Sequence, residues 1–129
     1  MARIRIFSII SVLVLFILSA CSTSKIFTFT GESENWSAKL VVNQANDFEK
    51  QEFTLQYKGK DVKSVGEMTY KVETNSGGFG GTGASLDKNG ILENAQEANP
   101  SNAKVIKESD IDVIVEWNNQ TEEIKLKLD

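Results

Sequence analysis

The side chains that could carry acid–base chemistry in this sequence are carboxylates, because the chain contains no histidine and a single cysteine. Glu32 and Glu34 straddle Ser33 in a polar stretch, and such a pair could act as acid and base or bind a cation. Asp87 is the third candidate. With no histidine or second carboxylate cluster to place beside them, a solvated turn is the better interpretation of Glu32 and Glu34. We therefore predict no catalytic residue.

The segment Asp87-Lys88-Asn89-Gly90 resembles part of a calcium-binding loop. Aligning Gly90 with the glycine of such a loop places Ser85 first and Gln96 last, where a bidentate glutamate is required. We therefore predict no metal site, and no other cofactor.

A glycine-rich stretch, Gly78-Phe79-Gly80-Gly81-Thr82-Gly83, spells the dinucleotide-binding pattern G-x-G-x-x-G. That chemistry needs a following helix whose N-terminus binds the pyrophosphate, and no helical period follows here. A flexible loop over residues 75–83 is the expected structure. Its one large apolar side chain, Phe79, either folds back on the core or is exposed to dock a partner.

The only cysteine lies in Leu18-Ser19-Ala20-Cys21, at the end of an apolar run over residues 6–18 that follows Arg3 and Arg5. A basic head, an apolar run and a small-residue exit are the three parts of a secretory signal. The run of 13 residues is too short for a helix to cross a hydrocarbon core about 30 Å thick. An uncleaved membrane helix is the alternative.

With Cys21 at its boundary, the segment resembles bacterial lipoprotein signals. The resemblance implies that Cys21 becomes the first mature residue, that its sulfur carries a diacylglycerol, and that its amine can be acylated. The protein would then be held on the extracytoplasmic face of the cell membrane. More than one acyl chain is needed for stable anchoring, because one chain binds only marginally.

The net charge of the mature chain excludes some classes of binding partner. Cleavage after residue 20 would leave 109 residues, enough for one domain, with 12 Lys and Arg against 18 Asp and Glu and a side-chain balance of −6. Such an acidic chain is repelled by an anionic bilayer, so nucleic acid and lipid headgroups are both poor partners for it, and the lipid anchor would have to do the holding. Acylation of Cys21 would also remove the only thiol. The expected division is a signal peptide over 1–20, a lipidated N-terminus and tether over 21–30, and one β domain over 31–129.

Alternating apolar and polar residues predict short β-strands along the mature chain. They are expected over residues 36–43, 52–57, 68–73, 111–117 and 123–128, with a further strand over 26–30 and a corner or bulge at Gly66. Residues 85–91 are expected to form a short strand that runs into a turn at Asn89-Gly90. Residues 44–50 are expected to connect two strands, and residues 92–98 to form a loop. Trp36 and Trp117 are in phase with inward-facing neighbours, which favours core packing over an exposed aromatic platform.

The last two strands define their own register. A two-residue loop at Asn118-Asn119, or a four-residue loop about the same centre, would oppose Val113 to Ile124 and Ile111 to Leu126. Asparagine tolerates the positive φ of a tight hairpin turn. Six to eight antiparallel strands of this kind indicate an all-β, immunoglobulin-like sandwich, with a small β-barrel as the alternative.

Two further motifs, Gly31-Glu32-Ser33-x-x-Trp36 and Val115-Glu116-Trp117-Asn118 followed by residues 122–126, resemble those of a group of small lipoproteins of Gram-positive bacteria. In that group a glycine commonly follows the Trp-Asn, where this chain has Asn119. The resemblance implies a lipid-anchored, compact β domain and supplies no activity. The expected function is a non-enzymatic interaction or accessory module of the cell envelope. A small-ligand carrier and a carboxylate-dependent envelope enzyme are the alternatives, and Phe79, Glu32 and Glu34 form the candidate binding surface.

Overall fold

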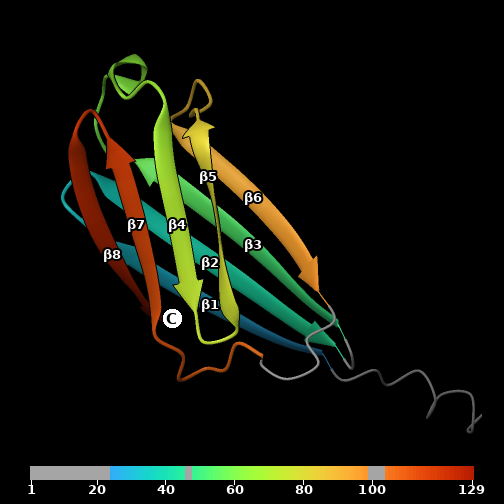
Figure 1. The fold of residues 1–129 in the computed structure, drawn as a ribbon. Helices are drawn as coiled ribbons and strands as arrows, with labels where there is room; N and C mark the ends of the chain where they lie inside the picture. Colours follow the sequence, from blue (N-terminus) through green and yellow to red (C-terminus); the bar gives the residue numbers. More distant parts are fainter. Residues whose placement is uncertain (1–23, 46–47, 99–103) are drawn as a thin grey trace, which may run out of the picture.

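The computed structural model describes residues 24–45, 48–98 and 104–129. They form eight antiparallel strands and one short 3-10 helix, η1 (Val62–Ser64). The strands are β1 (Ser24–Glu32), β2 (Trp36–Ala45), β3 (Phe48–Tyr57), β4 (Met68–Thr74), β5 (Gly77–Ala84), β6 (Ile91–Ala98), β7 (Ile111–Trp117) and β8 (Gln120–Leu128) (Figure 1).

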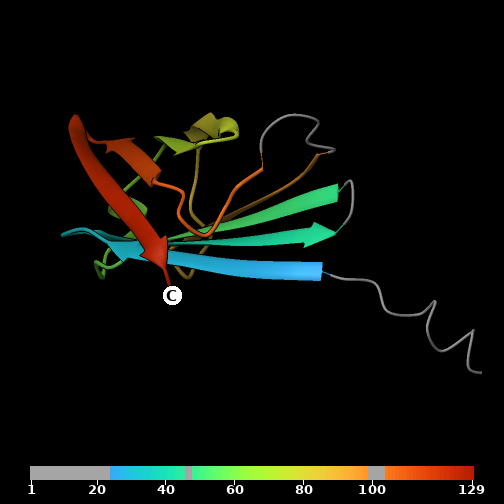
Figure 2. The same ribbon diagram turned by 90° about the horizontal axis from the view of Figure 1, so that it is seen from below.

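The strands belong to one curled sheet in the order β5-β4-β7-β8-β1-β2-β3-β6. The sheet bends most where β8 meets β1, because only Phe29 and Thr30 of β1 pair there, with Leu128 and Lys127. In Figure 2 β8 crosses from the half that contains β7 to the half that contains β1, β2 and β3. The result is a half-barrel with β5 and β6 as its free edges.

The all-β, antiparallel prediction is confirmed, but the two-sheet sandwich is wrong. A sandwich needs two separate sheets, whereas the β1–β8 hydrogen bonds make the two halves continuous. The barrel alternative is closer to the structure, although β5 and β6 are not sheet neighbours and the barrel is not closed.

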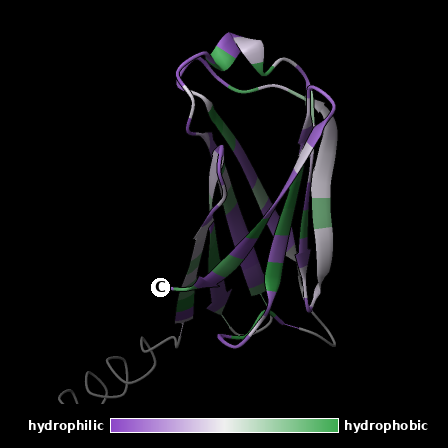
Figure 3. Ribbon diagram, turned by 90° about the vertical axis from the view of Figure 1, so that its left-hand side faces the viewer, coloured by the Kyte–Doolittle hydropathy of each residue, from purple (hydrophilic) through white to green (hydrophobic). Residues whose placement is uncertain are grey.

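The alternating patterns mark the inner face of the curl correctly. Every second residue of β2 from Trp36 to Val42 is buried, as is every second residue of β7 from Ile111 to Trp117. Figure 3 shows the corresponding hydrophobic and hydrophilic bands along the strands. The two halves meet through aromatic rings: Phe53 of β3 stacks on Tyr70 of β4, with 5.8 Å between ring centroids.

The C-terminal hairpin confirms the two-residue turn. Val113 pairs with Ile124, and Ile111 pairs with Leu126. Asn118 and Asn119 have φ values of 46° and 59°, the left-handed conformation that a tight primed turn requires. The corner expected at Gly66 is also present, because this glycine has a φ of 65° and lies between η1 and β4.

The structure differs from the expectations at several places in the middle of the chain. Residues 75–83, expected as a loop, contain most of β5, and residues 92–98 belong to β6 rather than to a loop. In each case an established strand supplies the backbone partners: β4 pairs with β5, and β3 pairs with β6 over Glu49–Gln56. Tertiary pairing therefore outweighs the weak strand preference of these sequences. Residues 85–87 are not a strand, but the turn expected at Asn89-Gly90 is present, with the Gly90 N–H donating to the Asp87 carbonyl at 3.0 Å. β2 and β3 extend into the expected 44–50 connection.

Candidate functional site

The candidate carboxylates Glu32 and Glu34 lie at the β1–β2 turn, which a third carboxylate holds in place. Glu122 Oε1 accepts hydrogen bonds from Ser33 Oγ at 2.6 Å and from the Asn35 backbone N–H at 2.9 Å. Its other oxygen accepts from Asn35 Nδ2 at 2.6 Å. Glu122 belongs to β8, so these bonds join the β1–β2 turn to the C-terminal hairpin.

Lys58 completes this cluster, which we call the Glu122 network (Ser33, Asn35, Lys58 and Glu122). Its Nζ donates to the Ser33 carbonyl at 3.1 Å and lies 3.6 Å from Glu32 Oε2. Burial acts to raise the pKa of Glu122, but the hydrogen bonds from Ser33 and Asn35 and the charge of Lys58 outweigh it, and the pKa is lowered. A carboxylate that is ionised and occupied by three donors is suited to holding a turn rather than to accepting a proton from a substrate.

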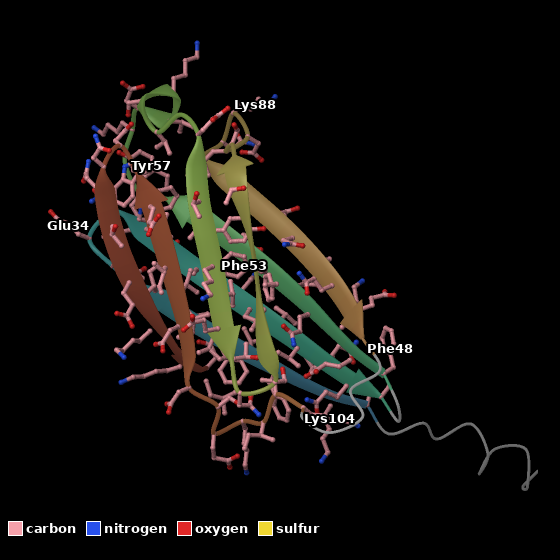
Figure 4. All side chains as sticks on the ribbon, viewed as in Figure 1. Glu34, Phe48, Phe53, Tyr57, Lys88 and Lys104 are labelled. Carbon is pink, nitrogen blue, oxygen red and sulfur yellow. The ribbon has the colours of Figure 1, made fainter. Side chains whose placement is uncertain are left out.

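The structure does not bring the three candidate carboxylates to one place. Figure 4 shows Glu34 at the left edge of the molecule and Lys88, the neighbour of Asp87, near its top, so the two turns lie apart. The Asp87 carboxylate stabilises its own turn, because its Oδ1 accepts hydrogen bonds from the backbone N–H of Asn89 at 2.8 Å and of Ile91 at 2.9 Å. Glu32 is exposed and pairs with Lys58.

Potential metal ligands are equally dispersed. Within residues 24–45, 48–98 and 104–129, no three His, Cys, Asp or Glu side chains are placed so that they could hold a metal ion. An open recess of about 560 Å³ beside the β7–β8 turn is lined by polar groups, with two carboxylates, Glu67 and Glu116, among them. Gln96, the last position of the calcium-loop alignment, belongs to β6.

The glycine-rich motif is an edge strand and not a phosphate-binding turn. It lies within β5, and the next element after it is β6, while η1 is the only helix in the described part of the chain. A Cβ atom on Gly80 would lie 2.2 Å from the Tyr70 carbonyl oxygen, and one on Gly78 would lie 2.8 Å from the Val72 oxygen. These two glycines allow β5 to lie close against β4.

Phe79 is half-buried and packs edge-on against Phe53, at 5.8 Å between ring centroids. Across the same interior, Asn94 Nδ2 of β6 donates to Tyr70 Oη of β4 at 2.7 Å. Side chains rather than strand hydrogen bonds thus connect the two sheet margins.

Both tryptophans belong to the core, as their spacing predicted. Trp36 is fully buried and its indole lies 5.3 Å from that of Trp117 and 5.2 Å from the ring of Tyr57, measured between centroids. Trp36 Nε1 has no hydrogen-bond acceptor in the described part of the chain. The exposed aromatic platform considered above is therefore absent at these two positions.

Two residues that matter to the structure were not singled out by sequence reasoning. Glu122 meets its partners across 87 and 89 residues of sequence, so only the fold reveals the network. Glu49, 3% exposed, accepts from Gln44 Nε2 at 3.0 Å and from the Val105 backbone N–H at 3.1 Å. Gln44 Nε2 also donates to the Val105 carbonyl. The sequence did contain a signal for Glu49, because this polar residue has the same parity as the buried residues Phe53 and Leu55 of its strand.

Cys21 and the signal segment lie outside the described residues. In the part that is described, no helix has the length and apolar character needed to cross a membrane. The chain matches no protein-family model, no curated protein and no solved structure.

Proposed function

We propose that this protein is a lipoprotein on the extracytoplasmic face of the cell membrane, and that it acts there as a non-enzymatic interaction module. The observation that carries the proposal is the short separation in sequence between Leu18-Ser19-Ala20-Cys21 and the first strand of the sheet. β1 begins at Ser24, so three residue steps separate the acylated sulfur from the folded domain. A fully extended chain covers about 11 Å in three steps, which would hold the domain against the membrane.

The free edge of β5 is the surface best suited to a protein partner. β5 has the sequence GGFGGTGA, without a charged residue or a proline, and it pairs with β4 on one side only. Edge strands are commonly protected by charge or proline, as Glu93 and Glu97 protect β6 at the other margin. An unprotected edge can accept an extended segment by strand addition.

The other functions considered have weaker support. A carrier needs an internal cavity, but the rings of Phe53, Tyr70 and Phe79 occupy the space between the two halves. A carboxylate-dependent enzyme needs at least two carboxylates in one pocket, whereas Glu34 and Asp87 lie apart and Asp87 binds its own turn.

The anchor is tested by comparing the wild-type chain with Cys21→Ser in a bacterial host. Wild-type protein should sediment with membranes and carry acyl mass on its N-terminal peptide, and the variant should lose both properties. A wild-type polypeptide that keeps Met1, or that is trimmed without acylation, would contradict the anchor.

The interaction surface is tested by placing a photo-crosslinking amino acid at exposed Thr82 of β5 in membrane-bound protein. The matched control places it at Lys39, which is exposed on β2 in the middle of the sheet. We expect a discrete adduct from position 82 that is missing from position 39. Equal labelling from both positions, or from neither, would contradict binding at the β5 edge.

A further inference from the structure

One end of the curled sheet, which we call the tether end, contains Ser24, the first described residue, which follows Cys21 by three positions in the sequence. The start of β1, the end of β2, the start of β3 and the end of β6 meet there (Figure 1). Ser24 pairs with Ala45, Ala45 pairs with Phe48, and Glu49 pairs with Ala98. Residues 104–106 join this end through the hydrogen bond from the Val105 N–H to Glu49.

Exposed apolar side chains are concentrated at the tether end. Four large apolar side chains are exposed in the described part of the chain, and three of them lie here: Ile26 at 63%, Phe48 at 37% and Ile106 at 51%. The fourth, Leu128, is on β8 opposite Phe29. Large apolar side chains that are exposed together at one end of a domain indicate a contact with another molecule or with a membrane.

These side chains have no role in the core. In β1 the buried side chain is Phe29, so the alternation of the strand turns Ile26 to the outer face. In β3 the buried residues Glu49, Phe53 and Leu55 are odd-numbered, which places Phe48 on the outer face as well. Ile106 directly follows Val105, which is fully buried. The side chains of all three residues therefore point away from the core.

Chain length limits how far this surface can lie from the lipid headgroups. A bilayer is about 40–45 Å thick with its headgroups and about 30 Å without them, which leaves about 5–8 Å of headgroups per leaflet. The three steps from Cys21 to Ser24 reach at most about 11 Å. Phe48 is level with Ser24 and two strands away, about 10 Å to the side. The tether is therefore too short to hold Phe48 far from the bilayer.

Charge at the tether end has both signs. Lys25 and Lys107 are exposed there, but so are Glu97 and Glu108. Attraction to anionic lipid therefore does not explain this surface, and its apolar side chains do.

We propose that Phe48, Ile26 and Ile106 form a membrane-contact surface that inserts among the headgroups of the leaflet holding the acyl chains of Cys21. This inference rests on the proposed lipid anchor. It adds a fixed orientation: the domain leans on the bilayer with its tether end and presents its opposite end and the β5 edge to the envelope.

The test uses acylated full-length protein, purified from membranes of an expressing bacterium and reconstituted into vesicles of brominated phosphatidylcholine, which quenches tryptophan emission on contact. Phe48→Trp carries the reporter, and Lys88→Trp at the opposite end is the matched control (Figure 4). Trp36 and Trp117 are buried at that opposite end, and β2 spans about 30 Å between the two ends, so their emission is an internal reference.

We expect the brominated lipid to remove most of the emission added by Phe48→Trp and little of that added by Lys88→Trp. The mass of the N-terminal peptide is measured on the same samples. An acylated protein whose two reporters are quenched equally would overturn the membrane-contact surface and leave the anchor standing. A protein without acyl mass would overturn both.

Discussion

The two ends of the curled sheet differ in how their large apolar side chains are arranged: they are buried at one end and exposed at the other. At the end opposite Ser24, the rings of Trp36, Tyr57 and Trp117 pack together, and the polar groups of the Glu122 network hydrogen-bond to one another. At the tether end a buried carboxylate, that of Glu49, accepts a hydrogen bond from the Val105 N–H, while large apolar side chains face outward. The first end has its aromatic rings inside and the polar groups of the Glu122 network paired, whereas the second leaves large apolar side chains exposed.

The largest loss of stability is expected from removing a buried aromatic side chain at the first end. Trp36→Ala should lower the free energy of unfolding by about 3–5 kcal/mol, because a fully buried indole is replaced by a cavity. Phe48→Ala at the tether end should cost less than about 1 kcal/mol in detergent-free buffer, since its ring contributes little to the core. Urea unfolding of both variants measures the difference, and equal losses would refute the distinction between the ends.

Removing the central carboxylate of the Glu122 network should have the next largest effect. Glu122→Ala deletes charge-assisted hydrogen bonds worth about 1.5–3 kcal/mol and frees the β1–β2 turn. Glu123→Ala, at the exposed next position of β8, is the matched control. Similar urea midpoints for the two variants would show that the network does not stabilise the turn.

The same network predicts a dependence on pH. The pKa of Glu122 is lowered in the folded state from an ordinary value of 4.5, so its contribution is fully present above that value and is lost as pH falls through the folded pKa. The wild-type chain should therefore lose more stability than Glu122→Gln when thermal unfolding is followed downward from pH 4.5. Parallel curves for the two proteins would contradict the assignment.

A smaller effect is expected from Glu49 at the tether end. Glu49→Ala leaves the Val105 N–H without its acceptor, and an unsatisfied buried donor costs about 1–3 kcal/mol. Hydrogen exchange of residues 104–106 should accelerate, while exposed Glu97→Ala should leave it unchanged. Unchanged exchange in Glu49→Ala would show that the carboxylate does not hold this segment.

The smallest effect concerns the turn that closes the first end. Asn119→Gly should change stability by less than about 0.5 kcal/mol, because glycine adopts the φ of 59° without strain. Asn119→Val should cost about 1–2 kcal/mol, because a side chain other than Asn or Asp meets its own carbonyl in this conformation. Thermal unfolding separates these outcomes, and equal melting temperatures would contradict the turn assignment.

Parts of the fold whose information is local were predictable. The C-terminal hairpin is one example, because parity and two asparagines define its register without reference to other strands. The buried state of Trp36 and Trp117 is another, since each follows the period of its strand. β5 and β6 were missed because their strand pairing is supplied by β4 and β3, and five glycines give β5 little preference of its own.

Of the candidate site, the sequence indicated Glu32, Glu34, Asp87 and Phe79 as individual residues but gave no information about their separation. That the Glu122 carboxylate holds the turn containing Glu34, and that Asp87 lies elsewhere, depends on register between strands far apart in the chain.

The sequence by itself determined the alternating strands, the hairpin at Asn118-Asn119 and the inward-facing residues, because two-residue periodicity and turn chemistry act over a few neighbours. Only the tertiary structure decided that the strands form one curled sheet, since the two pairs that join β1 to β8 leave no local signal. It also decided which carboxylates meet and which apolar side chains remain exposed. Those outcomes depend on contacts across 50 to 100 residues, where no local pattern specifies the partner.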